Sequence, residues 1–314
     1  MKVAAVLVVA CILLGLGAPA LPGASRDVGL LVAPVAAPSG ADMNITELHE
    51  WPGDDDRTPT IDQTDGSADL SLVPDGAWNA IVSLGFYELS LDPAQPVAND
   101  PARSRLGYGE LELFPRRFSR SGTVVGCDLD LDYARSSGAF SWQRCDGSVV
   151  LFVHLQAQAT SSWMVELIAT TQRELHLPAA FPGLAYCHLD PHLQWSLGFP
   201  FSSLHWQPRP DWTISGQVAD NSQLSVVYGS GMLQPGLVAS RSTTVLRVSQ
   251  EGERGDAVSY AETGLTAQLT LIVGRYGSLV AGAGRALLRV LHEPTQNLRL
   301  GSAWQSTLGG EFDF

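Results

Sequence analysis

The C-terminal segment from Leu298 to Phe314 alternates between two kinds of side chain. Even-numbered positions include the large apolar residues Trp304, Leu308 and Phe312, and odd-numbered positions carry polar or small residues. Because successive side chains of a β-strand point to opposite faces, this period of two predicts one strand with an apolar face and a polar face. The segment exceeds the roughly 9–11 residues with which a tilted strand crosses a bilayer.

The same alternation recurs upstream, between clusters of turn-forming residues. Apolar residues occupy every second position in 265–273 and 153–159, with polar residues between them. Amphipathic helical periodicity is hard to find, so the pattern favours an all-β chain. We expect strands at 77–91, 105–114, 123–134, 148–159, 162–174, 193–199, 202–207, 211–218, 223–229, 242–249, 264–275, 278–291 and 298–314.

The first residues are typical of an export signal. Lys2 supplies a positive charge, Val3 to Leu16 is almost continuously apolar, and Ala18-Pro19-Ala20 resembles a cleavage site. We therefore predict a signal peptide over 1–24. Residues 25–74, which include the run Asp54-Asp55-Asp56, are acidic and rich in turn formers, and we expect a disordered lead-in there. The β domain would then span 75–314.

Two architectures fit this alternation. In a soluble β-sandwich the apolar faces pack inward, whereas in a membrane barrel they point outward to lipid and the polar faces line a lumen. Beyond the signal peptide no segment has 18 consecutive apolar residues, so helices that cross a membrane are not expected.

The final strand favours the barrel. It resembles the last strand of bacterial outer-membrane β-barrel proteins, which ends in an aromatic residue with apolar residues at alternate positions before it; here Trp304, Leu308, Phe312 and Phe314 share one face. The segment Leu193 to Ser215, in which a strand ends in a proline turn before a Trp-bearing strand, is similar to uncharacterised families of the same class. The resemblance implies recognition of the last strand by the barrel-assembly machinery, so deletion of Phe314 should impair assembly.

We therefore predict an antiparallel, up-and-down transmembrane β-barrel of roughly 10–12 strands, in contact with lipid of the bacterial outer membrane. Its function would be that of a narrow pore or a structural envelope component. The alternative is a secreted or periplasmic sandwich that acts as a binding module. A shift between boiled and unboiled samples on a detergent gel would distinguish the barrel from the sandwich.

Charge supplies candidates for the lumen wall. The formal net charge is -13, which opposes the basic surface that nucleic-acid binding requires. Like charges on one strand face need water or arginine opposite them. We expect an acidic wall with arginines crossing the lumen to pair with it, and an open lumen would favour cations. The candidates are Glu110, Glu112, Asp128, Asp130, Asp132, Arg285, Arg289 and Arg299.

The cysteines left after signal removal are Cys127, Cys145 and Cys187. Export exposes them to an oxidising compartment, so one disulfide is expected. A bridge between Cys127 and Cys145 across a hairpin is our first expectation, although the sequence also permits the other pairings.

Two sets of residues carry candidate chemistry. Thiol, imidazole and carboxylate in Cys187-His188-Leu189-Asp190-Pro191-His192 are metal ligands, but their spacing matches no standard motif, and we favour an exposed polar turn over a metal site. His154 with Ser161 or Ser162 would suit a lipid hydrolase on an outer barrel wall, but no orienting third group is evident. We therefore predict neither an enzyme nor a cofactor.

Overall fold

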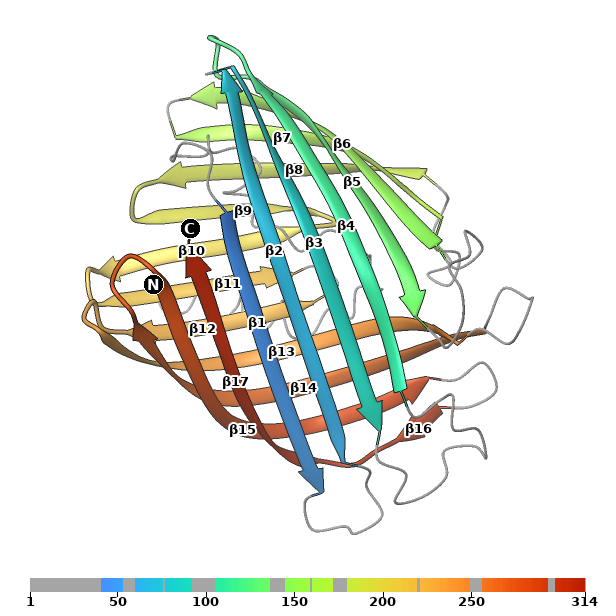
Figure 1. Cartoon of the computed structure of the whole chain (residues 1–314). Helices are drawn as coiled ribbons and strands as arrows, with labels where there is room; N and C mark the ends of the chain where they lie inside the picture. The colour runs from blue at the N-terminus through green and yellow to red at the C-terminus, as the bar shows by residue number, and fades with distance from the viewer. Residues whose placement is uncertain are drawn as a thin grey trace.

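The computed structural model describes residues 41–52, 60–75, 77–91, 105–135, 145–158, 160–171, 180–218, 221–248, 256–292 and 297–313, and the regular elements in them are β-strands (Figure 1). Among these residues no helix is long and apolar enough to cross a membrane. The signal-peptide prediction for 1–24 and Phe314 lie outside the described residues. The strands are β1 (Ala41–Pro52), β2 (Ile61–Asp75), β3 (Trp78–Leu91), β4 (Arg105–Phe118), β5 (Val124–Arg135), β6 (Cys145–Gln158), β7 (Ser161–Thr170), β8 (Ala180–Asp190), β9 (Leu193–Phe199), β10 (Ser202–Arg209), β11 (Trp212–Val218), β12 (Ser222–Tyr228), β13 (Leu233–Val248), β14 (Asp256–Ile272), β15 (Gly277–His292), β16 (Asn297–Arg299) and β17 (Ala303–Asp313).

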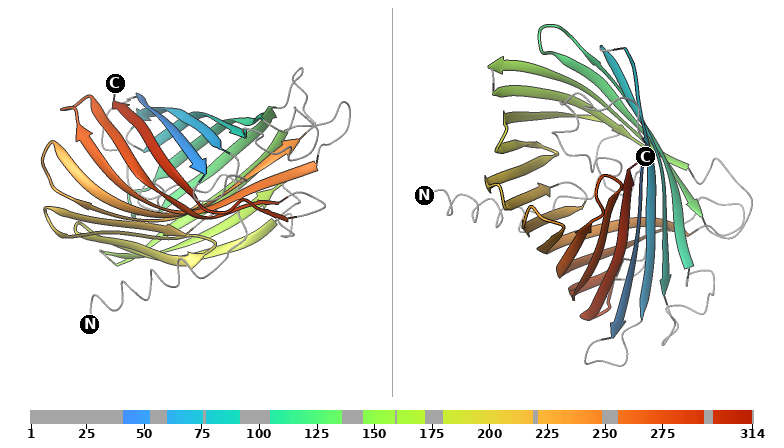
Figure 2. Two further views of the ribbon diagram at one scale, coloured as in Figure 1. Left: turned by 90° about the horizontal axis from the view of Figure 1, so that it is seen from below. Right: turned by 60° about the vertical axis from the view of Figure 1, so that its left-hand side comes forward.

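These strands form one closed antiparallel sheet. Consecutive strands pair from β1 to β16, and β17 pairs with β1 over Pro52↔Ala303 to Asp42↔Asp313, which closes the barrel. Figure 1 shows β17 and β1 side by side, and Figure 2 shows the sheet curving back on itself. β16 and β17 both pair with β15 and are separated only by residues 300–302, so the 17 segments make 16 barrel strands. The up-and-down barrel prediction is confirmed, and the expected count of 10–12 strands is too low.

Large apolar side chains cover the outer face. They recur at alternate positions on strands all around the barrel, and side chains such as Leu197 (67% exposed) and Leu308 (62% exposed) face outward without protein cover. An apolar surface this extensive is not typical of soluble monomers, whose exposed apolar patches rarely exceed a few hundred Å². The sandwich alternative is wrong, because a single closed sheet leaves no second sheet for these faces to pack against.

The two ends of the barrel differ. At the end where β1 begins and β17 finishes, the connections between strands are short, with 119–123 among the longest. At the opposite end, the connections 92–104 and 136–144 are longer. Exposed aromatic residues gather next to the short turns, namely Trp78, Trp163, Trp212, Tyr228 and Tyr276. Short turns at one end, longer loops at the other and a girdle of aromatics are typical of outer-membrane barrels.

The barrel begins earlier in the chain than the sequence suggested. β1 and all of β2 except its last residue fall within 25–74, so the prediction of a disordered lead-in is wrong for the described part of that range. The signal was hidden because β2 carries polar residues on both faces in its first half, for example Asp62 on the outer face and Gln63 on the inner face. β8 was also missed. Its inner and outer faces are both apolar, and alternation cannot mark such a strand.

The strands differ in length around the barrel. β9, β10, β11 and β12 have only 7 or 8 residues each, whereas β13, β14 and β15 have 16 or 17. The four short strands are therefore below the roughly 9–11 residues that a tilted membrane span takes.

Candidate functional site in the barrel lumen

The predicted acidic residues lie on the inner wall. Glu110 faces Asp132 across the β4–β5 pair, and Glu112 faces Asp130 one rung further. Carboxylate oxygens of Glu110, Asp130 and Asp132 lie within 4.8 Å of one another. Asp128 follows on the next inner position of β5 and is buried. These five carboxylates therefore share one face of β4 and β5, and the structure gathers three of them into one acidic cluster.

The three predicted arginines lie on different faces of the sheet. Arg285 lies opposite Trp304 and its guanidinium carbon sits 5.5 Å from the Trp304 ring centre, on the outer face. Arg299 is exposed and pairs with Val290, an outward position. Arg289 is fully buried on the inner side. The expectation that all three cross the lumen is wrong for Arg285 and Arg299.

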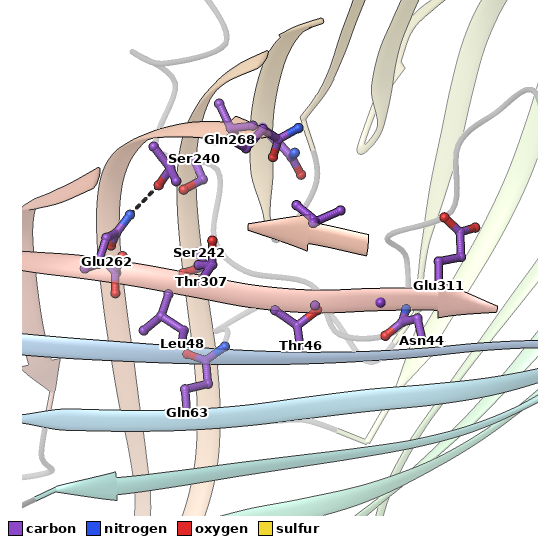
Figure 3. Close-up of a pocket in the computed structure, with 17 residues that line it drawn as sticks. Asn44, Thr46, Leu48, Gln63, Ser240, Ser242, Glu262, Gln268, Thr307 and Glu311 are labelled. Carbon is purple, nitrogen blue, oxygen red and sulfur yellow. Dashed lines mark hydrogen bonds between the residues drawn. The ribbon is translucent and has the colours of Figure 1, made fainter. Parts of the chain in front are cut away.

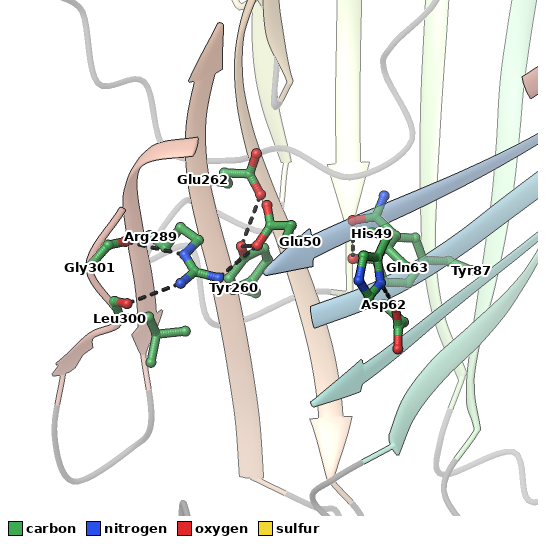
Figure 4. A network of polar contacts seen from close by, with 10 residues as sticks. All are labelled: His49, Glu50, Asp62, Gln63, Tyr87, Tyr260, Glu262, Arg289, Leu300 and Gly301. Carbon is green, nitrogen blue, oxygen red and sulfur yellow. Dashed lines mark hydrogen bonds and ion pairs between the residues drawn. The ribbon is translucent and has the colours of Figure 1, made fainter. Parts of the chain in front are cut away.

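A buried polar network surrounds Arg289 where the two ends of the sheet join (Figure 4). Its Nη1 donates to Glu50 Oε2 at 2.8 Å, and both side chains have no exposed area. The same guanidinium donates to the carbonyl oxygens of Leu300 and Gly301, in the break between β16 and β17. Tyr260 donates its hydroxyl to Glu262 at 2.9 Å and to Glu50 at 3.3 Å. Arg289 therefore pairs with Glu50 at the closing seam of the barrel.

The balance of charge on the inner wall is strongly negative. In the described strands the inner-face cations are Arg116 and Arg289, and Arg116 is held by a 2.9 Å hydrogen bond to Asn79 and by the rings of Phe114 and Phe118. The inner-face acids include Asp42, Glu50, Asp65, Asp69, Glu110, Glu112, Asp128, Asp130, Asp132, Asp146, Glu166, Glu262 and Glu311.

One part of the inner wall is apolar, which the sequence did not reveal. Phe114 and Phe152 stack with ring centres 5.7 Å apart, and both are buried. Around them lie further buried residues from β3 to β8, namely Ile81, Val124, Met164, Ala185 and Cys187. Barrel interiors are usually polar, so this apolar cluster is a packed filling of one side of the lumen. In addition, β13 approaches β4 and β5 across the lumen to within 8 Å between Cα atoms.

The opposite side of the lumen holds a cavity of about 590 Å³ (Figure 3). Its walls come from β1, β2, β12, β13, β14, β15 and β17. Most lining side chains are neutral amides or hydroxyls, namely Asn44, Thr46, Gln63, Gln223, Ser240, Ser242, Thr266, Gln268, Gln305 and Thr307. Nothing in the sequence marked these residues, because serine, threonine and glutamine on one strand face are equally typical of a solvated sandwich.

The residues weighed for a hydrolase or a metal site do not form either arrangement in the part of the chain that the structure describes. His154 is buried on the inner wall, and in the described structure neither ring nitrogen makes a hydrogen bond, so it does not engage Ser161 or Ser162. In the Cys187 to His192 stretch, Cys187 points inward, whereas His188 stacks on Trp195 with ring centres 5.9 Å apart. Pro191 and His192 form the expected turn.

The predicted disulfide between Cys127 and Cys145 is wrong; both are free thiols. Cys127 pairs with Leu151 and Cys145 with Tyr133, so the two positions are six residues apart along the β5–β6 ladder. At about 3.3 Å per residue this is roughly 20 Å, far beyond the Cα separation of about 7 Å that a disulfide tolerates.

Comparisons with known proteins give structural likenesses only, since no family model and no curated protein matches the chain. An outer membrane channel from Pseudomonas putida F1 is 11% identical, with 92% of this chain and 100% of that chain covered and a TM-score of 0.39. A mutant of the monoaromatic hydrocarbon channel TodX is 8% identical, with 92% of each chain covered and a TM-score of 0.45. A bacterial polysaccharide outer membrane secretin is 9% identical, with 87% of this chain and 98% of that chain covered and a TM-score of 0.31. The strand pairing of the chain itself defines its barrel.

Proposed function

We propose that this protein is a passive channel of the bacterial outer membrane that admits small polar solutes and disfavours anions. The observation that carries this proposal is the opposition of the two faces. The outer face is apolar and suited to lipid, whereas the inner face holds many carboxylates, few arginines and a cavity of about 590 Å³. The aromatic girdle and the short-turn end support insertion in a bilayer.

The sign of selectivity follows from the inner wall. The acidic cluster of Glu110, Asp130 and Asp132 lies on β4 and β5, and Arg289 is already paired with Glu50. Rings and clusters of carboxylates in a pore raise the local concentration of cations and repel anions. The fixed negative charge of the lumen therefore predicts a channel that passes K⁺ better than Cl⁻.

Reconstitution in a planar bilayer tests this proposal. Under a KCl gradient we expect a reversal potential of the sign given by K⁺ selectivity, and the double substitution Glu112→Gln with Asp130→Asn should reduce the K⁺ to Cl⁻ permeability ratio severalfold by removing two wall charges. Asp62→Asn is the matched control, because it removes an exposed carboxylate from the outer face, where it contacts His49. Absence of any conductance, or a preference for Cl⁻, would contradict the proposal.

A further inference from the structure

The cavity on the open side of the lumen differs chemically from the acidic wall. Its lining amides and hydroxyls can each donate and accept hydrogen bonds, in contrast to carboxylates, which when ionised only accept. They approach from different strands: in Figure 3, Gln63 comes from β2, Thr307 from β17, and Gln268 from β14. A solute in this space would meet neutral donors and acceptors on several sides.

Glycines on the same wall leave room for these polar side chains. A Cβ atom on Gly282 would come within 2.3 Å of Thr307 Oγ1 and 2.9 Å of Thr266 Cγ2. A Cβ on Gly309 would lie 3.1 Å from Thr46 Oγ1. Only a residue without a side chain at position 282 leaves the two threonines where they are, so the wall is flat and its hydroxyls face the cavity. Gln305 is fixed further by its 2.5 Å hydrogen bond to Thr266.

The remaining lining residues define the charge and the apolar contacts of a fitting solute. The carboxylates Glu262 and Glu311 belong to the lining, and no lysine or arginine does, which disfavours an anion. Leu48, Val238 and Val280 add small aliphatic surfaces. At about 30 Å³ per water molecule, the cavity holds the volume of roughly 20 waters, which suffices for a small organic solute.

Building on the channel proposed above, we infer that this cavity is a binding and selection site for uncharged, polyhydroxylated solutes such as polyols and monosaccharides. Their hydroxyl groups both donate and accept, as the lining requires, and their C–H faces match the aliphatic contacts. The site gives the channel a substrate preference that the acidic wall alone would not, since the wall acts on charge.

Glucose is the probe for this site, in two measurements on the full-length protein. The first is the concentration dependence of glucose uptake into proteoliposomes, with K⁺ conductance recorded on the same preparation. The second is equilibrium binding of glucose to the detergent-solubilised protein by calorimetry. The test variant combines Gln63→Leu, Gln268→Leu and Thr307→Val, which remove hydrogen-bonding groups and retain side-chain volume. Thr263→Val, on the outer face of β14, is the control.

We expect saturable glucose uptake by the wild-type protein and the control, and a half-saturating concentration raised at least about tenfold in the triple variant. The loss of three hydrogen bonds makes a change of this size reasonable. K⁺ conductance on the same preparation shows whether the triple variant still inserts and forms a channel. Uptake that does not saturate, or equal glucose affinity in the triple variant and the control, would overturn the site while leaving the channel intact. Glucose binding without any conductance would instead overturn the channel and retain the site.

Discussion

The two sides of the lumen wall carry different classes of side chain. From β3 to β8, a cluster of aromatic and aliphatic side chains packs on the inner face, and Phe114 within it has no exposed area. From β12 through β17 to β2, most of the side chains that line the cavity are neutral amides or hydroxyls, and they surround open space. One sheet thus carries a packed side and an open side. The difference shows that the number of strands alone does not set the width of the open lumen, because side chains on one side of the barrel can fill part of it.

The carboxylates are most closely clustered on one side of the lumen. The acidic cluster lies on β4 and β5, at the edge of the packed side, whereas the open side is lined mostly by amides and hydroxyls. In the proposed channel the packed side would impose the preference for charge, and the open side would provide the space and the hydrogen bonds for a neutral solute. Substitutions on the two sides should therefore have effects of different kind.

The largest effect is expected at the centre of the packed side. Phe114→Ala should lower the free energy of unfolding by about 3–5 kcal/mol, because it leaves a cavity among fully buried neighbours such as Phe152. Denaturant unfolding in detergent micelles, followed by tryptophan fluorescence, measures the change. A loss below about 1 kcal/mol would show that the apolar cluster is not a packed core.

Alternation of apolar and polar residues in the sequence predicted the outer face of the barrel well and the composition of the inner face poorly. Lipid favours apolar residues at outward positions, so strands such as β14 and β17, whose outward residues are mostly apolar, could be recognised in the sequence. The inner face contacts either other side chains or the lumen, so its residues can be apolar, acidic or neutral. β8 was invisible for this reason, with Phe181 and Ala185 inward and Leu184 outward.

Irregularities in the ladder were the second obstacle. Arg285 and Arg289 are four residues apart and would share a face in a regular strand, yet they lie on opposite faces. The register of β14 with β15 shifts between Thr263 and Gly264, and the extra residue on β15 is Leu287. A bulge of this kind reverses the alternation beyond it. The break at 300–302 acts similarly, because Leu300 is buried on the inside although its even number placed it on the apolar outer face.

An effect of intermediate size is expected when an arginine is placed on the outer face and compared with an arginine on the open side of the lumen. Leu269 points outward and is 46% exposed, whereas its neighbour Gln268 lines the cavity. Leu269→Arg should cost about 2–4 kcal/mol if this position lies near the middle of the bilayer, because a charge would face lipid. Gln268→Arg should leave stability nearly unchanged and lower the K⁺ to Cl⁻ permeability ratio. Unfolding in lipid vesicles and reversal potentials measure the two responses, and equal destabilisation by both substitutions would contradict the assignment of faces.

The smallest effect is expected on the open side itself. Gln223 lines the cavity and its side chain is exposed, so Gln223→Ala removes no packed contact and should change the free energy of unfolding by less than about 0.5 kcal/mol. Met164→Ala, on the packed side and with no exposed area, is the counterpart and should cost about 2–5 kcal/mol. Both are measured by denaturant unfolding under one set of conditions. Similar losses for the two variants would mean that the sides are packed alike, and the cavity could then not serve as a path for solutes. A clear gap between them would show that the wall of β12 to β17 is not packed, as a solute path along it requires.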